Sequence, residues 1–343
     1  TENFNKNNVG LSYSHSVLDN GEMALAGAHE FGIRGNYLYV TSVKDHGLEI
    51  MDISDPGNPK HAGAFFDNDQ TFMKKPHSVT FKDNYAFVSA TEDSAVQVFD
   101  ISNPVDPKPV SYLKDDEKMG LKGVHGIAIN GNYLYAAGTK DNALEVIDIS
   151  NPNAIKHAAA VFDDEKTSLK GPHSIAFKDN YAYILTAEEG IEVIDISDPA
   201  NPRHVSSYTE NEHGHKFDGG HDIIISGNNL FTASYVDGLG FFDVTNPIKI
   251  KLISEIHPLE ENGLMSASDL ALSENNLFAV SEVSSALVMV DISNINKPII
   301  KSIVRDDGSG AMFLWNGHYV ETAGDYVYVA GLEDGFGIVK IIR

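Results

Sequence analysis

Residues 77–113 read HSVTFKDNYAFVSATEDSAVQVFDISNPVDPKPVSYL, and four short apolar segments alternate in them with polar turns. HSVTF and YAFVSA are separated by residues 82–84 (KDN), a composition typical of tight turns. AVQVFDIS ends at Asn103-Pro104, because proline cannot donate to a strand ladder, and PVSYL follows it. We therefore expect four antiparallel strands in this stretch.

The third of these segments recurs along the whole chain at steps of 47 to 49 residues. The copies read LEIMDIS, VQVFDIS, LEVIDIS, IEVIDIS, LGFFDVT and LVMVDIS, and a seventh, FGIVKII, has Lys340 at the aspartate position. The matching aspartates are Asp52, Asp100, Asp148, Asp195, Asp243 and Asp291. A four-stranded unit with a period in the forties is typical of β-propeller blades, whereas a solenoid needs polar caps at its ends. We expect one all-β domain over residues 1–343, a seven-bladed β-propeller with blades that start near residues 29, 77, 125, 173, 221, 268 and 318.

The two ends of the sequence complement each other. The last copy stops after its third strand, at Arg343, and residues 11–18 (LSYSHSVL) offer one spare strand before the first copy. We expect this N-terminal strand to become the outer strand of blade seven, so that every blade has four antiparallel strands. A ring closed in this way protects the strand edges that an open array exposes.

Charge and composition exclude several classes of partner. The chain has 25 Lys and Arg against 49 Asp and Glu, a net charge of -24. We expect a protein this acidic to bind neither nucleic acid nor an anionic membrane surface. It has no cysteine, which excludes disulfides, cysteine-bound zinc and iron–sulfur clusters. No apolar run reaches membrane-spanning length, so we expect no membrane insertion.

The pattern (L/I)-x-(V/I)-x-D-I-S followed by Asn/Asp-Pro resembles the LVIVD repeat of bacterial and archaeal proteins, many of them exported or attached to the cell surface. The resemblance covers residues 29–343, although blade seven lacks both the aspartate and the proline turn. It implies a β-propeller and an extracellular, cell-surface or periplasmic location. The motif is structural and implies no chemistry.

Alignment of the copies places a histidine at the first residue of the inner strand in six of the seven blades, and Ser268 in blade six. These histidines are His29, His77, His125, His173, His221 and His318. Sixteen residues beyond each lies an acid, and Ser284 takes its place in blade six. The acids are Asp45, Asp93, Asp141, Glu189, Asp237 and Asp334. The strand order brings both columns to one face of the ring, here named the top face, so we expect a His–carboxylate hydrogen bond in each blade.

Two interpretations of the histidine column remain open. In the first, the imidazoles ring the top of the central channel and bind a transition metal (copper, iron or zinc) or a small molecule, and the acids orient them as carboxylates orient metal-bound histidine. In the second, each His–acid pair is a structural clasp, and the protein is a non-enzymatic scaffold that docks a partner protein. His213 and His215, in the connection entering blade five, are either additional ligands or part of a solvated loop.

A third interpretation is a metal-free lyase or hydrolase in which a histidine is the base and a tyrosine, such as Tyr39 or Tyr135, is the acid. The sequence has no G-x-S-x-G, H-E-x-x-H or phosphate-loop motif, so it identifies no catalytic residue and does not decide whether the protein is an enzyme. The remaining repeated histidines precede the outer strands and are expected at the periphery; they are His61, His157 and His204.

Overall fold

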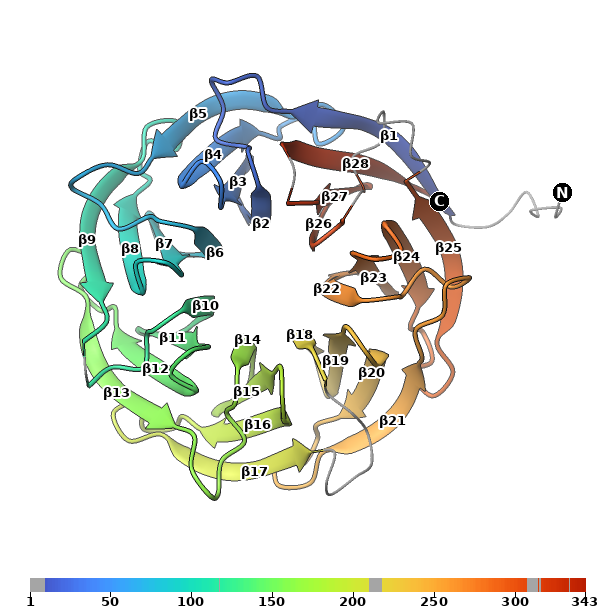
Figure 1. The fold of residues 1–343 in the computed structure, drawn as a ribbon. Coiled ribbons are helices and arrows are strands. Elements are labelled where there is room, and N and C mark those ends of the chain that lie inside the picture. The colour runs from blue at the N-terminus through green and yellow to red at the C-terminus, as the bar shows by residue number, and fades with distance from the viewer. Residues whose placement is uncertain (1–9, 117, 210–217, 307–313, 315, 333) are drawn as a thin grey trace, which may run out of the picture.

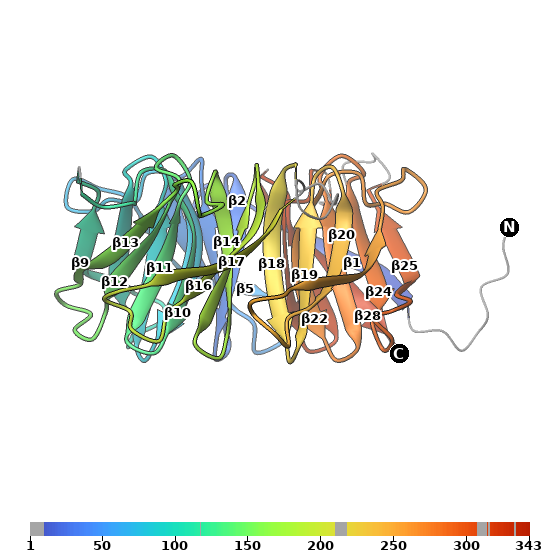
Figure 2. The same ribbon diagram turned by 90° about the horizontal axis from the view of Figure 1, so that it is seen from below.

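The computed structural model describes residues 10–116, 118–209, 218–306, 314, 316–332 and 334–343. The regular elements in these residues are β-strands, arranged as seven four-stranded antiparallel sheets around one axis (Figure 1). From the side the ring is a short cylinder with connecting loops on both flat faces (Figure 2). The predicted seven-bladed β-propeller is thereby confirmed.

In each blade the strands follow one another from the axis outward. Blades one and two consist of β2 (Ala28–Arg34), β3 (Tyr37–Ser42), β4 (Gly47–Asp52), β5 (Lys60–Phe66), and β6 (Pro76–Lys82), β7 (Tyr85–Ala90), β8 (Ala95–Asp100), β9 (Lys108–Lys114). Blades three and four consist of β10 (Val124–Asn130), β11 (Tyr133–Gly138), β12 (Ala143–Asp148), β13 (Lys156–Phe162), and β14 (Pro172–Lys178), β15 (Tyr181–Thr186), β16 (Gly190–Asp195), β17 (Arg203–Thr209). Blades five and six consist of β18 (Gly220–Ser226), β19 (Asn229–Ser234), β20 (Gly238–Asp243), β21 (Lys251–Ile256), and β22 (Ala267–Ser273), β23 (Asn276–Ser281), β24 (Ala286–Asp291), β25 (Ile299–Arg305).

Blade seven is assembled from both ends of the chain. β26 (Tyr319–Ala323), β27 (Tyr326–Ala330) and β28 (Gly335–Ile342) are its inner strands, and β1 (Gly10–Leu18) is its outer strand. β1 pairs antiparallel with β28 in a register that runs from Gly10–Ile342 to Leu18–Gly335. The two strands lie side by side in Figure 1, which confirms the predicted closure of the ring.

The hydrophobic core is divided among the interfaces between neighbouring blades. Alternating side chains of the middle strands point to both faces of each blade, so each pair of adjacent blades encloses a cluster of buried apolar residues. Tyr39 and Tyr135 belong to these clusters and pack at 5.0 Å from Phe81 and 5.1 Å from Phe177. They are core residues, and their suggested role as catalytic acids beside a histidine is wrong. Among the described residues, no helix is long and apolar enough to span a membrane.

A turn and a bulge at the start of the inner strand aim the side chain at the histidine position toward the axis. In every blade a residue with positive φ stands just before this strand: Gly27, Lys75, Gly123, Gly171, Gly219, Ser266 and Asn316. In blades one to six a register shift follows; in blade four, Pro172 pairs with Thr186 and Ser174 pairs with Leu185, which leaves His173 as the extra residue. Because a bulge bends the strand and redirects the inserted residue, the histidine position faces the channel instead of a neighbouring blade.

Candidate functional site: a histidine ring on the propeller axis

Six imidazoles from six blades form a closed ring around the channel. The centroid distances around the ring, from His29 to His77, His125, His173, His221, His318 and back to His29, are 4.1, 4.2, 3.8, 3.9, 4.7 and 4.6 Å. Residues up to 289 positions apart in the sequence thereby share one site. The sequence predicted this convergence because the first residues of the inner strands all meet at the same end of the axis.

Hydrogen bonds fix the orientation of three of these imidazoles. The Nδ1–H of His173 donates to the carbonyl of His221 at 2.8 Å, and the Nδ1–H of His221 donates to the carbonyl of Ser268 at 2.7 Å. The Nδ1–H of His318 donates to Oε1 of Glu282 at 2.5 Å. These bonds set the tautomer, so Nε2 is the nitrogen whose lone pair is available in each ring. Metal-bound histidines show the same arrangement, in which the second ring N–H donates to a carbonyl or carboxylate.

Burial keeps five of the six ring imidazoles neutral. Burial, reinforced by neighbouring imidazoles, lowers the pKa of His77 to about 3 and holds the pKa of His29, His125 and His221 well below the usual range. Burial also lowers the pKa of His173 to about 4. A neutral imidazole has a nitrogen lone pair that can coordinate a cation, which metal binding by histidine requires.

Blade six completes the ring with a different side chain. Ser268 stands at the histidine position, and its hydroxyl donates to the carbonyl of Gly317 at 3.2 Å. Glu282, which follows β23, reaches into the space that is left, and its Oε1 accepts hydrogen bonds from His318 and from the hydroxyl of Tyr235 at 2.7 Å. Burial acts to raise the pKa of Glu282, but these two bonds outweigh it and hold the pKa below its usual value. The ring therefore contains one ionised carboxylate.

The ring is the floor of a pocket that opens on the top face. This pocket has a volume of about 460 Å³, and its walls include Val43, Ala187, Tyr235 and Leu332. All four lie fourteen residues beyond the histidine of their own blade, as Glu282 lies fourteen beyond Ser268. The sequence pattern does not reveal this wall, because the residue type varies at the fourteenth position, whereas the acids repeat uniformly two residues later. The wall is apolar on several sides and polar at Tyr235 and Lys75, as small-molecule sites often are.

In blades one to four the acids bind backbone N–H groups and, among the described residues, not the imidazoles, which corrects the His–carboxylate bonds expected there. The carboxylates of Asp45, Asp93, Asp141 and Glu189 accept hydrogen bonds from the backbone N–H of Ala26, Lys74, Lys122 and Lys170, at distances of 2.8 to 3.3 Å. In blade six the hydroxyl of Ser284 accepts from the N–H of Met265 at 3.1 Å, so serine takes the same role. These N–H groups precede the turn of positive φ and lie outside the strand ladder, so the acid binds the connection directly.

The last two acids of the column have other contacts. Asp237 lies 3.5 Å from the hydroxyl of Ser234, and Asp334 forms an ion pair with Lys44 at 3.5 Å. The side chain of Asp334 is 63% exposed, so it orients no buried imidazole. His213 and His215, the suggested additional ligands, lie outside the described residues.

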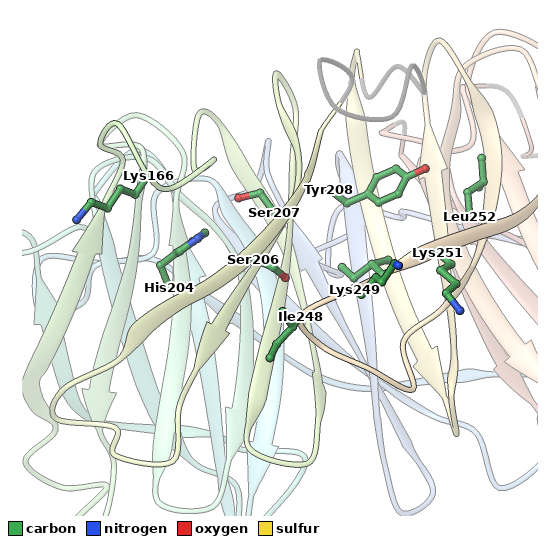
Figure 3. Close-up of a pocket in the computed structure, with 10 residues that line it drawn as sticks. Lys166, His204, Ser206, Ser207, Tyr208, Ile248, Lys249, Lys251 and Leu252 are labelled. Carbon is green, nitrogen blue, oxygen red and sulfur yellow. The ribbon is translucent and has the colours of Figure 1, made fainter.

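The other repeated histidines lie at the rim, as predicted. His61, His157 and His204 each place Nδ1 at 2.5 to 2.6 Å from a buried glutamate of the neighbouring strand: Glu49, Glu145 and Glu192. Figure 3 shows a larger cavity of about 800 Å³ at this rim, between β17 and β21. Its lining includes Lys166, Lys249 and Lys251, but His204 is already bonded to its glutamate. We therefore place the candidate site on the axis.

The family model of the LVIVD repeat matches residues 28–67, 75–112, 123–158, 172–210 and 266–306. These matches correspond to blades one to four and blade six, and together they cover more than half of the chain. The chain belongs to the LVIVD-repeat family. In this LVIVD-repeat protein, blades five and seven are not matched, and they contribute Tyr235 and His318 to the ring region. No curated protein matches the sequence significantly.

Solved structures confirm the fold at low sequence identity. Virginiamycin B lyase from Staphylococcus aureus, in a catalytically inactive histidine-to-alanine variant with quinupristin, is 11% identical with a TM-score of 0.69, over 97% of this chain and 99% of that chain. Hydrazine synthase from Kuenenia stuttgartiensis is 13% identical with a TM-score of 0.68, over 95% and 97%. The computationally designed protein Ika8 is 14% identical with a TM-score of 0.61, over 94% and 98%. At these identities the likeness shows the propeller architecture alone.

Proposed function

We propose that this LVIVD-repeat propeller binds a transition metal in the axial histidine ring and that a small molecule reaches the metal through the pocket above it. The observation that supports this most strongly is the closed ring of six imidazoles, in which three rings have Nδ1 bonded to oxygen and Nε2 available. A structural clasp would require imidazoles that bond within their own blades. The ring bonds instead cross between blades.

The donor set defines which metals fit. Imidazole nitrogen suits copper, zinc and iron(II), and the nearby carboxylate of Glu282 adds an oxygen donor. A bound metal would supply a Lewis acid or a redox centre to a ligand in the pocket. The chain's own residues would position that ligand. Tyr235, which is hydrogen-bonded to Glu282, offers a hydroxyl at the wall, and Val43, Ala187 and Leu332 offer apolar contacts.

Metal analysis tests this proposal directly. The protein is produced without a histidine tag, purified without a nickel column, and analysed for metal before and after incubation with copper, zinc or iron(II) and gel filtration. We expect at least one tightly held ion per chain, and a lower content when His221 is replaced by alanine. His257→Ala is the matched control, because His257 is an exposed rim histidine with its Nε2 3.0 Å from Glu255. Protein that retains none of the three metals would overturn the proposal.

A metal-free acid–base site is the second candidate function, and one specific contact favours it. Tyr235, Glu282 and His318 form a continuous hydrogen-bonded chain at the pocket wall, with distances of 2.7 and 2.5 Å at Glu282. Such a chain can deliver or remove a proton at a ligand that enters the pocket. Activity that survives complete removal of metal by a chelator, and that is lost in Tyr235→Phe, would favour this candidate over the metalloprotein.

We also infer that the protein acts outside the cytoplasm, at the cell surface or in the periplasm. The LVIVD resemblance supports this location, because many proteins with this repeat are exported or surface-attached. Fractionation of the producing cells, with an antibody against the native protein, tests it. Recovery of the protein in the cytoplasmic fraction alone would contradict the inference.

A further inference from the structure

The histidine ring has two halves with different donor sets. Ligand atoms of His29, His77 and His125, from blades one to three, all lie within 4.8 Å of one another. The same holds for His221, Glu282 and His318, from blades five to seven. No residue belongs to both groups, and each group has the three protein ligands that an open metal site uses. His173 lies between them, with ring centroids 3.8 Å from His125 and 3.9 Å from His221.

The half formed by His221, Glu282 and His318 brings two imidazoles and one carboxylate together. The Nδ1–H of His221 donates to the carbonyl of Ser268, so His221 presents Nε2. Nδ1 of His318 faces Oε1 of Glu282 at 2.5 Å, so an ion bound by both of these residues would displace the proton between them. Two imidazoles and one carboxylate are the donor set typical of non-haem iron(II), and zinc accepts it as well.

The half formed by His29, His77 and His125 has polar atoms that lack ordinary partners. Nδ1 of His77 lies 2.6 Å from Nε2 of His125, so these two nitrogens share one proton. Nδ1 of His29 is buried, and among the described residues it has no hydrogen-bond partner. A buried polar atom without a partner is destabilising, and a ligand at that atom would relieve the cost. Three imidazole nitrogens are a donor set that suits copper or zinc.

We propose that the ring is a dinuclear centre, with one metal ion bound by His29, His77 and His125 and a second bound by His221, Glu282 and His318. This inference rests on the proposed function, because it requires that the ring binds metal at all. The two groups of ligands adjoin, since His29 and His318 belong to different halves and their rings lie 4.6 Å apart. The ligand in the pocket therefore meets two metal ions of unequal donor sets.

Zinc stoichiometry in half-ring variants tests the dinuclear centre. The tag-free protein is stripped with a chelator, loaded with zinc alone, freed of excess zinc and analysed for zinc per chain. We expect about two zinc ions in the wild type, about one in His77→Ala, about one in His221→Ala and none in the double variant. His257→Ala, at the exposed rim histidine, is expected to keep both ions. Circular dichroism and thermal unfolding verify that each variant is folded. If His77→Ala is not folded, His125→Gln replaces it, and if His221→Ala is not folded, His318→Gln replaces it.

The outcomes separate the two proposals. One zinc ion in the wild type, or loss of all zinc in each single variant, overturns the dinuclear centre and leaves a mononuclear ring. No zinc in the wild type, and no copper or iron(II) in its place, overturns the proposed function as well. Two ions that are lost independently, one with each half, support both.

Discussion

At the residue scale, blade six differs from the other blades at two linked positions. It has Ser268 where six blades have histidine, and it has Glu282 where the others have apolar side chains, threonine or tyrosine. The hydroxyl of Ser268 bonds to the backbone of blade seven, and the carboxylate of Glu282 bonds to His318. The exchange replaces one imidazole of the ring with one carboxylate. The part of the ring at blade six therefore differs chemically from the rest.

The histidines could be predicted from the sequence, but Glu282 could not. The reason is a difference between two aligned positions, sixteen and fourteen residues beyond the histidine position. The acids sixteen residues beyond the histidines repeat because they hold the incoming connection, which every blade has. The position fourteen residues beyond varies from Val43 through Ala187 to Tyr235 and Glu282. A repeated residue serves a need that all blades share, whereas a varied residue at a shared place on the top face marks the pocket wall. Only the structure shows that this position faces the ring.

Glu282→Gln separates the charge of this side chain from its size. Glutamine retains an oxygen that accepts from Tyr235 and His318, but it removes the negative charge beside the metal ligands. We expect metal affinity to fall about 10- to 100-fold, because an uncharged amide is a weaker metal ligand than a carboxylate and a weaker acceptor for His318. Competition with a coloured chelator measures the affinity. Glu274→Gln is the control, because the side chain of Glu274 is 65% exposed and pairs with Arg343; equal affinities in the two variants would contradict the role of Glu282.

At the scale of the blade, one turn recurs at the end of the third strand. Each of the six repeat aspartates accepts a hydrogen bond from the backbone N–H two residues later, at 2.8 to 2.9 Å. Hydrogen bonds from Ser293 lower the pKa of Asp291 to about 2, and a hydrogen bond from Lys301 contributes to the same shift. The sequence predicted this turn because aspartate, serine and proline define it locally. The bulge that aims each histidine at the channel depends on pairing with the next strand and is not evident from composition.

These turns predict acid sensitivity with a definite sign. The folded pKa of Asp291, about 2, lies below its ordinary value of 3.8. A carboxylate with a lowered pKa contributes stability that is complete above pH 3.8 and is lost as the pH falls toward 2. Asp291→Asn keeps an oxygen acceptor and removes the charge. We therefore expect the variant to be less stable than the wild type at pH 6 and equal to it near pH 2, as measured by urea unfolding; a difference that persists unchanged at pH 2 would contradict the account.

At the scale of the whole molecule, ring closure and the axial site depend on each other. β1 closes blade seven against β28, and blade seven places His318 in the ring. Blade interfaces, each with its own apolar cluster, set the distance of every inner strand from the axis. A loss of closure would therefore change the spacing of the imidazoles as well as the stability of the fold.

Removal of residues 1–18 tests this link. The shortened chain lacks β1, so β28 becomes an exposed edge strand. The propeller also loses the strand pairing that joins the two ends of the chain. We expect a lower midpoint of thermal unfolding, a tendency to aggregate, and weaker metal binding, because exposed strand edges pair with other chains. A synthetic peptide of residues 10–18 added in trans should restore part of both properties. A shortened chain with unchanged unfolding and metal binding would contradict the role of closure.

The measurement that tests the central claim most directly is an anomalous-scattering map of the axial channel. Crystals of the tag-free protein are soaked in zinc, and data are collected on both sides of the zinc absorption edge. The account predicts strong peaks on the axis, within coordination distance of the ring imidazoles and Glu282, and none at the outer histidines His61, His157 and His204. An axis without anomalous density at saturating zinc, in a crystal that shows zinc only at the rim, would contradict it.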